Sequence, residues 1–398
     1  MRIFWIPFVV AIIINLLLDW FIYRQLKRST RLPRLKCRAH LILAAVINLL
    51  LVAVFVLPVR VVDNGKMHLV MWALFAYFAF YLPKYMAALV WLPSLAFKRK
   101  KVRLVWTHVA TVVGLFLFGA FWWGALVTSH RTQVKEVTLS YDNLPAAFDG
   151  YRIVQFSDAH LGTYNGDTTF VAKYVNEINA LKPDMIVFTG DLVNRQTSEA
   201  EPYREVLARL KAPDGVYSIL GNHDYDDYIE WPTEEMKQAD HRRLIDLQTH
   251  AGWVMLNNDH HLIVRDGDTI AIIGTENYGD PPFPQLGRLD EAYPNVRDAR
   301  FKILLQHNPF AWRDDVLPHS NIDLMLAGHT HAMQMMVTLF GHDYSPAAWR
   351  YDEWGGAYRE GDRVLYVNIG VGMVGFPARL GSAYPEITVF TLKCKAAK

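Results

Sequence analysis

Cysteine is almost absent from this chain: Cys37 and Cys394 are the only two among 398 residues. They provide no disulfide framework and leave the redox compartment unassigned. Acidic residues are equally scarce in the first 128 residues, where only Asp19 and Asp63 oppose 16 lysines and arginines. The remainder carries 37 acidic residues against 25 basic ones, so the net charge of +2 conceals a basic apolar part and an acidic polar part. Because the acidic part would repel a polyanion, we expect no nucleic-acid partner.

Charge is also scarce in four long apolar stretches of the N-terminal part, where Asp19 and Lys84 are the only charged residues. They lie at about residues 3–23, 41–59, 68–92 and 104–127. Each is long enough to cross the hydrocarbon core of a bilayer as a helix, so we predict a transmembrane region of four helices at residues 1–128. A cleaved signal peptide is the alternative for the first stretch, but its positive cluster follows the apolar run instead of preceding it.

The positive charges of this region gather in two segments. Twelve of the sixteen lysines and arginines lie between residues 24 and 38 or between residues 98 and 103. Short loops rich in lysine and arginine are retained in the cytoplasm, so both segments are predicted to be cytoplasmic. Both termini then lie outside. We therefore expect a multi-pass protein of an inner or plasma membrane with an extracytoplasmic C-terminal domain.

Two charged residues fall deep within the predicted helices, Asp19 in the first and Lys84 in the third. The two helices run in the same direction, and the two residues lie at similar depth, so they could pair. Charges inside a membrane are costly and usually have a partner. The alternative is that each side chain extends to the cytoplasmic surface. So few intramembrane charges argue against a transporter.

Short β-rich apolar runs dominate from residue 136 onward, and polar side chains follow five of them. These side chains are Asp158 and His160, then Asp191, then Asn222, His223 and Asp224, then His307, and finally His329 and His331. Between the first two runs, apolar residues recur at helical spacing over residues 170–181, which predicts a strand-helix-strand unit. Because open α/β sheets place their sites at the carboxyl ends of strands, we predict an α/β domain with its site there.

One Asp or His after a strand is usually a turn residue or a helix cap, whereas the joint pattern is much more specific. Asp158 and His160 stand two positions apart just past a strand, so they can project to the same side of the chain. His329 and His331 repeat that spacing. Glycines at 190, 221 and 328 allow tight turns and close backbone approach beside these side chains.

The order Asp-x-His, Gly-Asp, Gly-Asn-His-Asp, a lone His after a strand, and Gly-His-x-His resembles the calcineurin-like metallophosphoesterase superfamily. The resemblance covers nearly all of residues 129–398. It implies a four-layer α/β/β/α sandwich in which two mixed sheets pack face to face. The C-terminal stretch resembles the subgroup with N-terminal membrane anchors. Relatives often continue the last motif with two glycines, where this chain has Ala332 and Met333, which puts the shape of the adjacent substrate wall in question.

The resemblance also implies a site for two divalent metal ions. The implied ligands are Asp158, His160 and His331 for one ion, Asn222, His307 and His329 for the other, and Asp191 as the bridge. Two cations about 3.5–4 Å apart clamp a phosphoryl group and lower the pKa of a shared water, so that hydroxide forms at neutral pH. Imidazole and carboxylate ligands without thiolate favour Mn, Fe or Zn over Ca or Mg.

Two residues of the Gly-Asn-His-Asp motif are candidate catalytic residues instead of ligands. His223 would stabilise developing charge or protonate the leaving oxygen. Asp224 would orient His223, or it would only cap a helix. The following residues, 225–250, are rich in acids and aromatics and would form either a cap that selects the substrate or a solvated helical insertion.

We therefore expect a metal-dependent phosphoester hydrolase, a metallophosphoesterase. Its anchor favours a lipid-linked phosphomonoester, phosphodiester or pyrophosphate. One analogy is the superfamily members that cleave UDP-diacylglucosamine in lipid A synthesis, although an outside location argues against a cytoplasmic UDP-sugar. The alternative from a different class is a catalytically silent membrane scaffold, which would most simply lack a ligand, and no ligand is missing here.

Overall fold

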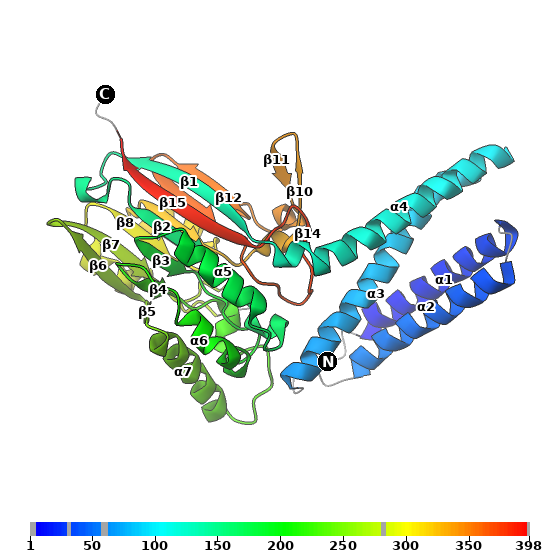
Figure 1. Ribbon diagram of the computed structural model, residues 1–398, viewed down its shortest axis with the longest axis horizontal. Helices are drawn as coiled ribbons and strands as arrows, with labels where there is room; N and C mark the ends of the chain where they lie inside the picture. Colours follow the sequence, from blue (N-terminus) through cyan, green and yellow to red (C-terminus); the bar gives the residue numbers. More distant parts are fainter. Residues whose placement is uncertain (1–4, 30–32, 57–62, 280–283, 396–398) are drawn as a thin grey trace. The chain divides into compact units, whose positions relative to one another are not determined.

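The computed structural model describes residues 5–29, 33–56, 63–279 and 284–395 (Figure 1). The chain forms two compact units, Met1–Trp123 and Gly124–Lys398, and each is described by itself. The ends of two predicted apolar stretches, at residues 3 and 59, lie outside the described residues.

Four long apolar helices occupy the N-terminal part of the chain. They are α1 (Trp5–Ser29), α2 (Pro33–Val56), α3 (Asn64–Trp91) and α4 (Lys100–Leu126). Each is long and apolar enough to span a membrane, as the sequence predicted. The helices extend beyond the apolar stretches, so basic residues such as Arg24 and Lys36 lie on helical turns and not in a loop. Pro33 opens α2, where the fixed φ of proline suits a first helical turn.

Asp19 and Lys84 form an ion pair within the first unit, which confirms that they pair. Their side chains are only 6% and 14% exposed. The hydroxyl of Tyr81 donates to the same carboxylate over 2.8 Å, and the ring of His40 lies 3.6 Å from it. Asp19 of α1 thereby has partners on both α2 and α3.

We expect charge reversal at this pair to show mutual rescue. Asp19→Lys or Lys84→Asp alone places like charges side by side in an apolar setting, and breaking a buried pair costs about 3–5 kcal/mol. Each single variant should therefore lower the thermal stability of the protein in detergent, and the double variant should recover much of the loss. Reversal of Lys66, whose exposed ammonium lies 3.0 Å from Asp63, is the matched control and should cost at most about 1 kcal/mol. Absence of recovery in the double variant would contradict the pairing.

Two six-stranded mixed sheets form the body of the second unit. The first contains, in spatial order, β1 (Gln133–Tyr141), β15 (Glu386–Cys394), β2 (Arg152–Phe156), β3 (Met185–Phe188), β4 (Val216–Ser218) and β5 (Trp253–Met255). The second contains β12 (Gly356–Glu360), β13 (Arg363–Val367), β9 (Leu324–Ala327), β8 (Lys302–Leu305), β7 (Asp268–Gly274) and β6 (Asp259–Arg265). A small third sheet contains β11 (His342–Tyr344), β10 (Met335–Leu339) and β14 (Leu380–Gly381).

The two large sheets pack face to face, with helices outside. Ile153 of the first sheet and Ile272 of the second belong to one buried cluster between the sheets. Val154, on the opposite face of its strand, packs instead in the cluster that includes Tyr174 of α5 (Thr169–Ala180). Trp312 is buried with residues of the second sheet on the other side. This is the predicted four-layer α/β/β/α arrangement, and Figure 1 shows α5, α6 (Arg204–Leu207) and α7 (Glu234–His250) along the first sheet.

All five strands predicted to precede polar side chains are present, but they divide between the two large sheets. β2, β3 and β4 are neighbouring parallel strands of the first sheet, whereas β8 and β9 are neighbours in the second. The side chain of Gln155 on β2 donates to the carbonyl of Ala327 on β9 over 2.8 Å, which ties the two sheets together at their carboxyl ends. The candidate site therefore draws on both sheets.

The segment 225–250 is neither a separable cap nor a solvated insertion. Its helix α7 is preceded by Thr233, whose hydroxyl accepts a hydrogen bond from the third helical amide. Leu244 and Leu247 of α7 are buried in the core beside the first sheet, and Asp240 accepts from the amide of Thr197 over 2.7 Å. Helix α7 is thus part of the outer helical layer, and it approaches the candidate site through His241, whose Nδ1 lies 3.0 Å from the carbonyl of Asp224.

Candidate metal centre

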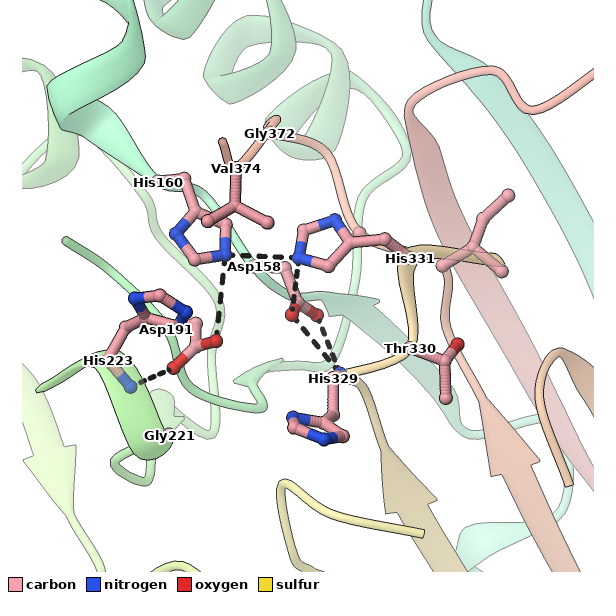
Figure 2. Close-up of polar contacts among 12 residues, drawn as sticks. Asp158, His160, Asp191, Gly221, His223, His329, Thr330, His331, Gly372 and Val374 are labelled. Atoms are coloured by element: carbon pink, nitrogen blue, oxygen red, sulfur yellow. Dashed lines mark hydrogen bonds and ion pairs between the residues drawn. The ribbon is translucent and has the colours of Figure 1, made fainter. Parts of the chain in front are cut away.

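One group of ligand atoms follows β2, β3 and β9. It consists of Asp158, His160, Asp191 and His331, all buried, with one ligand atom from each lying within 4.8 Å of the others. Figure 2 shows the rings of His160 and His331 facing one another, with 3.0 Å between their Nε2 atoms. Nε2 of His331 lies 3.1 Å from Oδ1 of Asp158, and Nε2 of His160 lies 3.5 Å from Oδ2 of Asp191.

A second group shares Asp191 with the first and adds His307 and His329. Oδ2 of Asp191 lies 3.2 Å from Nε2 of His307, which in turn lies 3.3 Å from Nδ1 of His329. Oδ1 of Asn222 is 2.8 Å from the same Nδ1. Its amide nitrogen donates to the hydroxyl of Tyr228 over 2.8 Å, which directs the amide oxygen towards the group. All seven residues predicted as ligands thus lie together, with Asp191 between the two sets.

The orientation of the histidines fits metal ligation. Nδ1 of His160 lies 3.2 Å from the carbonyl of Val193, and Nδ1 of His307 lies 2.6 Å from the carbonyl of Thr189. Because a carbonyl can only accept, each Nδ1 carries a proton, and each Nε2 faces the group as the atom that can offer a lone pair once it is deprotonated. Metal-binding histidines are commonly oriented in this way by a carbonyl or carboxylate behind the ring. The donor set therefore fits two divalent ions.

Five of the seven predicted ligands have backbone conformations that favour glycine. Positive φ angles of 53°, 43°, 63°, 76° and 52° occur at Asp158, His160, Asp191, His329 and His331. Such conformations cost about 1–3 kcal/mol each and cluster at functional sites. They turn the chain sharply just after each strand, so residues two apart can direct their side chains into one site.

Glycine is required at two positions beside the ligands. A Cβ on Gly328 would collide with the side chains of Ser157 and Asp158, and a Cβ on Gly221 would collide with Asp191. These close approaches bring β9 against the loop after β2, and the loop after β4 against the loop after β3. The predicted role of these two glycines is therefore confirmed.

The protonation states in the second group are set by burial and by mutual charge. Burial alone would raise the pKa of Asp191, but His307 and His223 hold it well below its usual range. Burial alone would lower the pKa of His307, but Asp191 raises it to about 9. Burial together with the charge of His307 lowers the pKa of His329 to about 3. Asp191 is therefore an anion and His329 is neutral, as ligands must be, whereas His307 must release a proton when it binds a metal.

The ring of His223 lies against the metal-ligand groups. Its backbone amide donates to Oδ1 of Asp191 over 2.8 Å (Figure 2). Its Nδ1 lies 2.7 Å from the carbonyl of Asn194. The carbonyl accepts the Nδ1 proton, so Nε2 is the ring atom that can exchange a proton with a substrate. Tyr228 stacks on this ring, with 4.0 Å between ring centroids and 8° between planes. Burial lowers the pKa of His223 below its usual value.

The Asp224 side chain binds backbone amides of the loops that form the site. Its carboxylate accepts hydrogen bonds from the amides of Asp191, Leu192 and Val193 over 2.8–3.2 Å, and from that of Gly221 over 3.0 Å. The last of these bonds is part of a capping interaction, which was one of the two predicted alternatives. Burial and the nearby charge of Asp191 raise the pKa of Asp224 to about 7. These contacts favour a positioning role for Asp224 over orientation of the His223 ring.

Two residues beside the metal centre have no role in the sequence-based prediction. Arg379 is fully buried, and its guanidinium donates to the carbonyls of Ile369, Gly370 and Gly372 over 2.6–2.9 Å, with one nitrogen 3.4 Å from Nδ1 of His331. Tyr351 bonds through its hydroxyl to Nε2 of His329 over 3.2 Å. Burial of an arginine among carbonyls has no local sequence signal, so the position of Arg379 could not be predicted.

The two positions at which relatives often have glycine take left-handed conformations here as well. Ala332 and Met333 have φ angles of 49° and 47°. A side chain at positive φ costs roughly 1–2 kcal/mol, and the exposed Met333 has few packing contacts to offset this cost. The side chains of Ala332 and Met333 therefore store conformational strain beside His331.

We expect Met333→Gly to raise the melting temperature by about 1–3 °C, because relief of strain exceeds the entropy that glycine adds to the unfolded chain. Met335, two residues later, has an extended φ of −140° and is 37% exposed, so Met335→Gly is the matched control and should lower the melting temperature. Differential scanning fluorimetry of the full chain measures both. A fall with Met333→Gly equal to that of the control would contradict strain at this position.

The layered fold and the Asp/His cluster define a metal-dependent phosphoester hydrolase, and comparisons with known proteins agree. The calcineurin-like phosphoesterase family model matches residues 151–333. The metallophosphoesterase YkuE of Bacillus subtilis is 34% identical over 283 residues, which cover 69% of this chain and 90% of the relative. A transmembrane protein with metallophosphoesterase domain from Danio rerio is 28% identical over 306 residues, 75% of this chain but only 63% of the relative.

The chain therefore belongs to the calcineurin-like phosphoesterase family and is a phosphoester hydrolase. Its four apolar helices, together with the transmembrane relative, associate it with a membrane.

Proposed function

We propose that this protein hydrolyses a lipid-linked phosphoester with the help of two divalent metal ions, Mn, Fe or Zn. The observation that carries the proposal is the position of Asp191, whose Oδ2 lies between His160 and His307, one from each ligand group. When bound, two such ions would supply Lewis-acid charge for the phosphoryl group and activate water.

The protein's own residues then perform three tasks. Asp191 keeps the two ligand groups together, and Asp224 holds the loop that carries it. His223 would take up a proton from solvent at Nε2 and, in this protonated form, transfer it to the leaving oxygen or stabilise the charge on that oxygen. Tyr228 and Tyr351 contact the site through His223 and His329, and we expect the leaving group to lie against their half-buried rings.

The activity test uses the full-length chain purified in detergent and depleted of metal with a chelator. We expect turnover of p-nitrophenyl phosphate or bis-p-nitrophenyl phosphate to return when Mn²⁺, Fe²⁺ or Zn²⁺ is added. The variant His319→Ala, which changes an exposed histidine paired with Asp315 outside the site, serves as a control and should behave as wild type. Metal binding without turnover of any phosphoester would identify a silent scaffold instead.

We also propose that the catalytic unit is extracytoplasmic, on the basis of the basic residues within segments 24–38 and 98–103. Because Cys37 is buried, cysteines introduced at the exposed residues Lys100 and Asp266 give a sharper test in a chain without Cys37 and Cys394. An impermeant thiol reagent should label Asp266→Cys in intact cells and Lys100→Cys only after permeabilisation. The opposite result would place the site in the cytoplasm and favour a nucleotide-linked lipid substrate.

A further inference from the structure

The hairpin formed by β10 and β11 presents an apolar surface to the outside of the second unit. Met335, Val337 and Leu339 alternate along the outward face of β10 and are 37%, 46% and 51% exposed. Phe340, at the turn, is 99% exposed. The solvent-facing side of a strand is normally polar, and this segment, residues 335–341, has no charged residue. Figure 1 shows the hairpin standing out from the body of the unit beside β14.

The conformation of the β10–β11 turn does not favour a phenylalanine at position 340. Phe340 and Gly341 both have positive φ angles, 53° and 80°, as in the two-residue hairpin turns that prefer Asn-Gly or Asp-Gly. The β6–β7 hairpin of the same unit has this preferred pair, Asp266 and Gly267, with φ angles of 49° and 85°. The same turn is therefore made in one hairpin with a polar residue and in the other with a large apolar residue in an unfavourable conformation.

The base of the hairpin is fixed to the end of α4. β10 pairs with β14 through Met335 and Leu380. The amide of Arg379 donates to the carbonyl of Gly124 over 3.2 Å, and a Cβ on Gly124 would collide with the side chain of Leu380. Gly124 lies in the last turn of α4 and belongs to the same compact unit as the hairpin. Leu380 of β14 therefore contacts both the base of the hairpin and the last turn of a helix that is long and apolar enough to span a membrane.

We propose that the β10–β11 hairpin inserts Leu339 and Phe340 into the interfacial region of the bilayer that α4 spans. Apolar side chains next to the membrane end of a helix gain by entering the headgroup boundary. Because residues 335–341 are uncharged, insertion requires no anionic lipid. In this proposal the exposed apolar surface is covered by lipid of the membrane that anchors the protein.

Insertion would also position the metal centre. Three residues, 332–334, connect the ligand His331 to β10, and all three have positive φ angles of 47–55°. Such a short and closely turned connection keeps the hairpin and the ligand in a fixed relation. If the proposed function holds, the hairpin brings the metal centre to the lipid surface, where a lipid-linked phosphoester would reach it without leaving the bilayer.

The test places an environment-sensitive fluorophore on the hairpin of the full-length chain. With Cys37 and Cys394 replaced by serine, Phe340→Cys carries the NBD fluorophore in phosphatidylcholine nanodiscs, and Asp266→Cys at the polar turn is the matched control. We expect blue-shifted emission at position 340 that is quenched by brominated phosphatidylcholine, and water-like, unquenched emission at position 266. Water-like emission at 340, or a blue shift that brominated lipid does not quench, overturns the proposal; the second result would indicate a protein partner or a second copy.

A second measurement compares substrate turnover in the chain that retains Cys37 and Cys394. Phe340→Asp keeps the turn, since aspartate occupies the equivalent position in the β6–β7 hairpin, and it should lower the ratio of lipid-phosphate to p-nitrophenyl phosphate turnover by about tenfold. Val264→Asp, at a 66% exposed residue of β6, is the matched control and should keep the ratio. An equal ratio in both variants would refute the role of the hairpin in substrate access. Failure of the proposed function is distinguishable, because wild type would then turn over neither substrate while the fluorophore result still stands.

Discussion

Asp191→Asn should remove metal and turnover together. The substitution nearly preserves shape but removes the anionic charge that lies 3.2 Å from His307 and 3.5 Å from His160. Stabilisation of a phosphoryl group by bound cations is worth several kcal/mol, and about 4 kcal/mol corresponds to a thousandfold change in rate. We therefore expect turnover of p-nitrophenyl phosphate to fall at least about a thousandfold, with metal content, measured by elemental analysis, falling in parallel.

Asp315→Asn provides the matched control for this substitution. Asp315 also pairs with a histidine, His319, at 3.0 Å, but on an exposed helix away from the ligand groups. Its variant should keep metal content and turnover. Wild-type turnover with full metal occupancy in Asp191→Asn would disprove the assignment of Asp191 as the bridging ligand.

The local part of the site could be predicted from the sequence because each motif is short. A strand, a sharp turn and a polar side chain lie within a few residues, so β2 with Asp158 and β3 with Asp191 were visible as patterns. The pairing of Asp19 with Lys84 was also accessible, because helices of known direction place residues at calculable depth. Both predictions depend on geometry within one secondary-structure element or between two regular helices.

The remaining features depend on contacts between distant segments. The division of the five strands between two sheets follows from strand pairing, which sequence periodicity does not encode. Arg379 reaches His331 only because β14 and the loop before it fold back beside β10. Asp224 looked like a partner for its neighbour His223, but the turn directs its carboxylate to amides more than thirty residues earlier in the chain.

The extension of the helices beyond the apolar stretches has a local cause instead. Basic side chains such as Lys36 looked like loop residues because apolarity ended before them, yet α2 begins at Pro33. Lysine and arginine are good helix formers, so an apolar stretch ends well before its helix does. The positive charge that defines the predicted orientation therefore lies largely on helical turns.

His223→Ala should keep the metals and lose turnover. None of the seven predicted metal ligands is altered, because the contact of His223 with Asp191 is made by its backbone amide, which alanine retains. General acid catalysis contributes about 10² to 10⁴-fold, so turnover should fall by that factor at unchanged metal content. The loss should be larger for an alkyl phosphoester than for p-nitrophenyl phosphate, because only the poorer leaving group needs a proton from Nε2.

Tyr228→Phe distinguishes the role of the His223 ring from that of the neighbouring Tyr228 hydroxyl. The phenylalanine ring keeps the stack on His223 at the 4.0 Å spacing but removes the hydroxyl that holds the amide of Asn222. It should therefore weaken metal binding without the dependence on the leaving group that marks His223→Ala. If His223→Ala instead released metal and affected all leaving groups equally, His223 would be a residue that supports the ligands, and the proton would have to come from another group or from water.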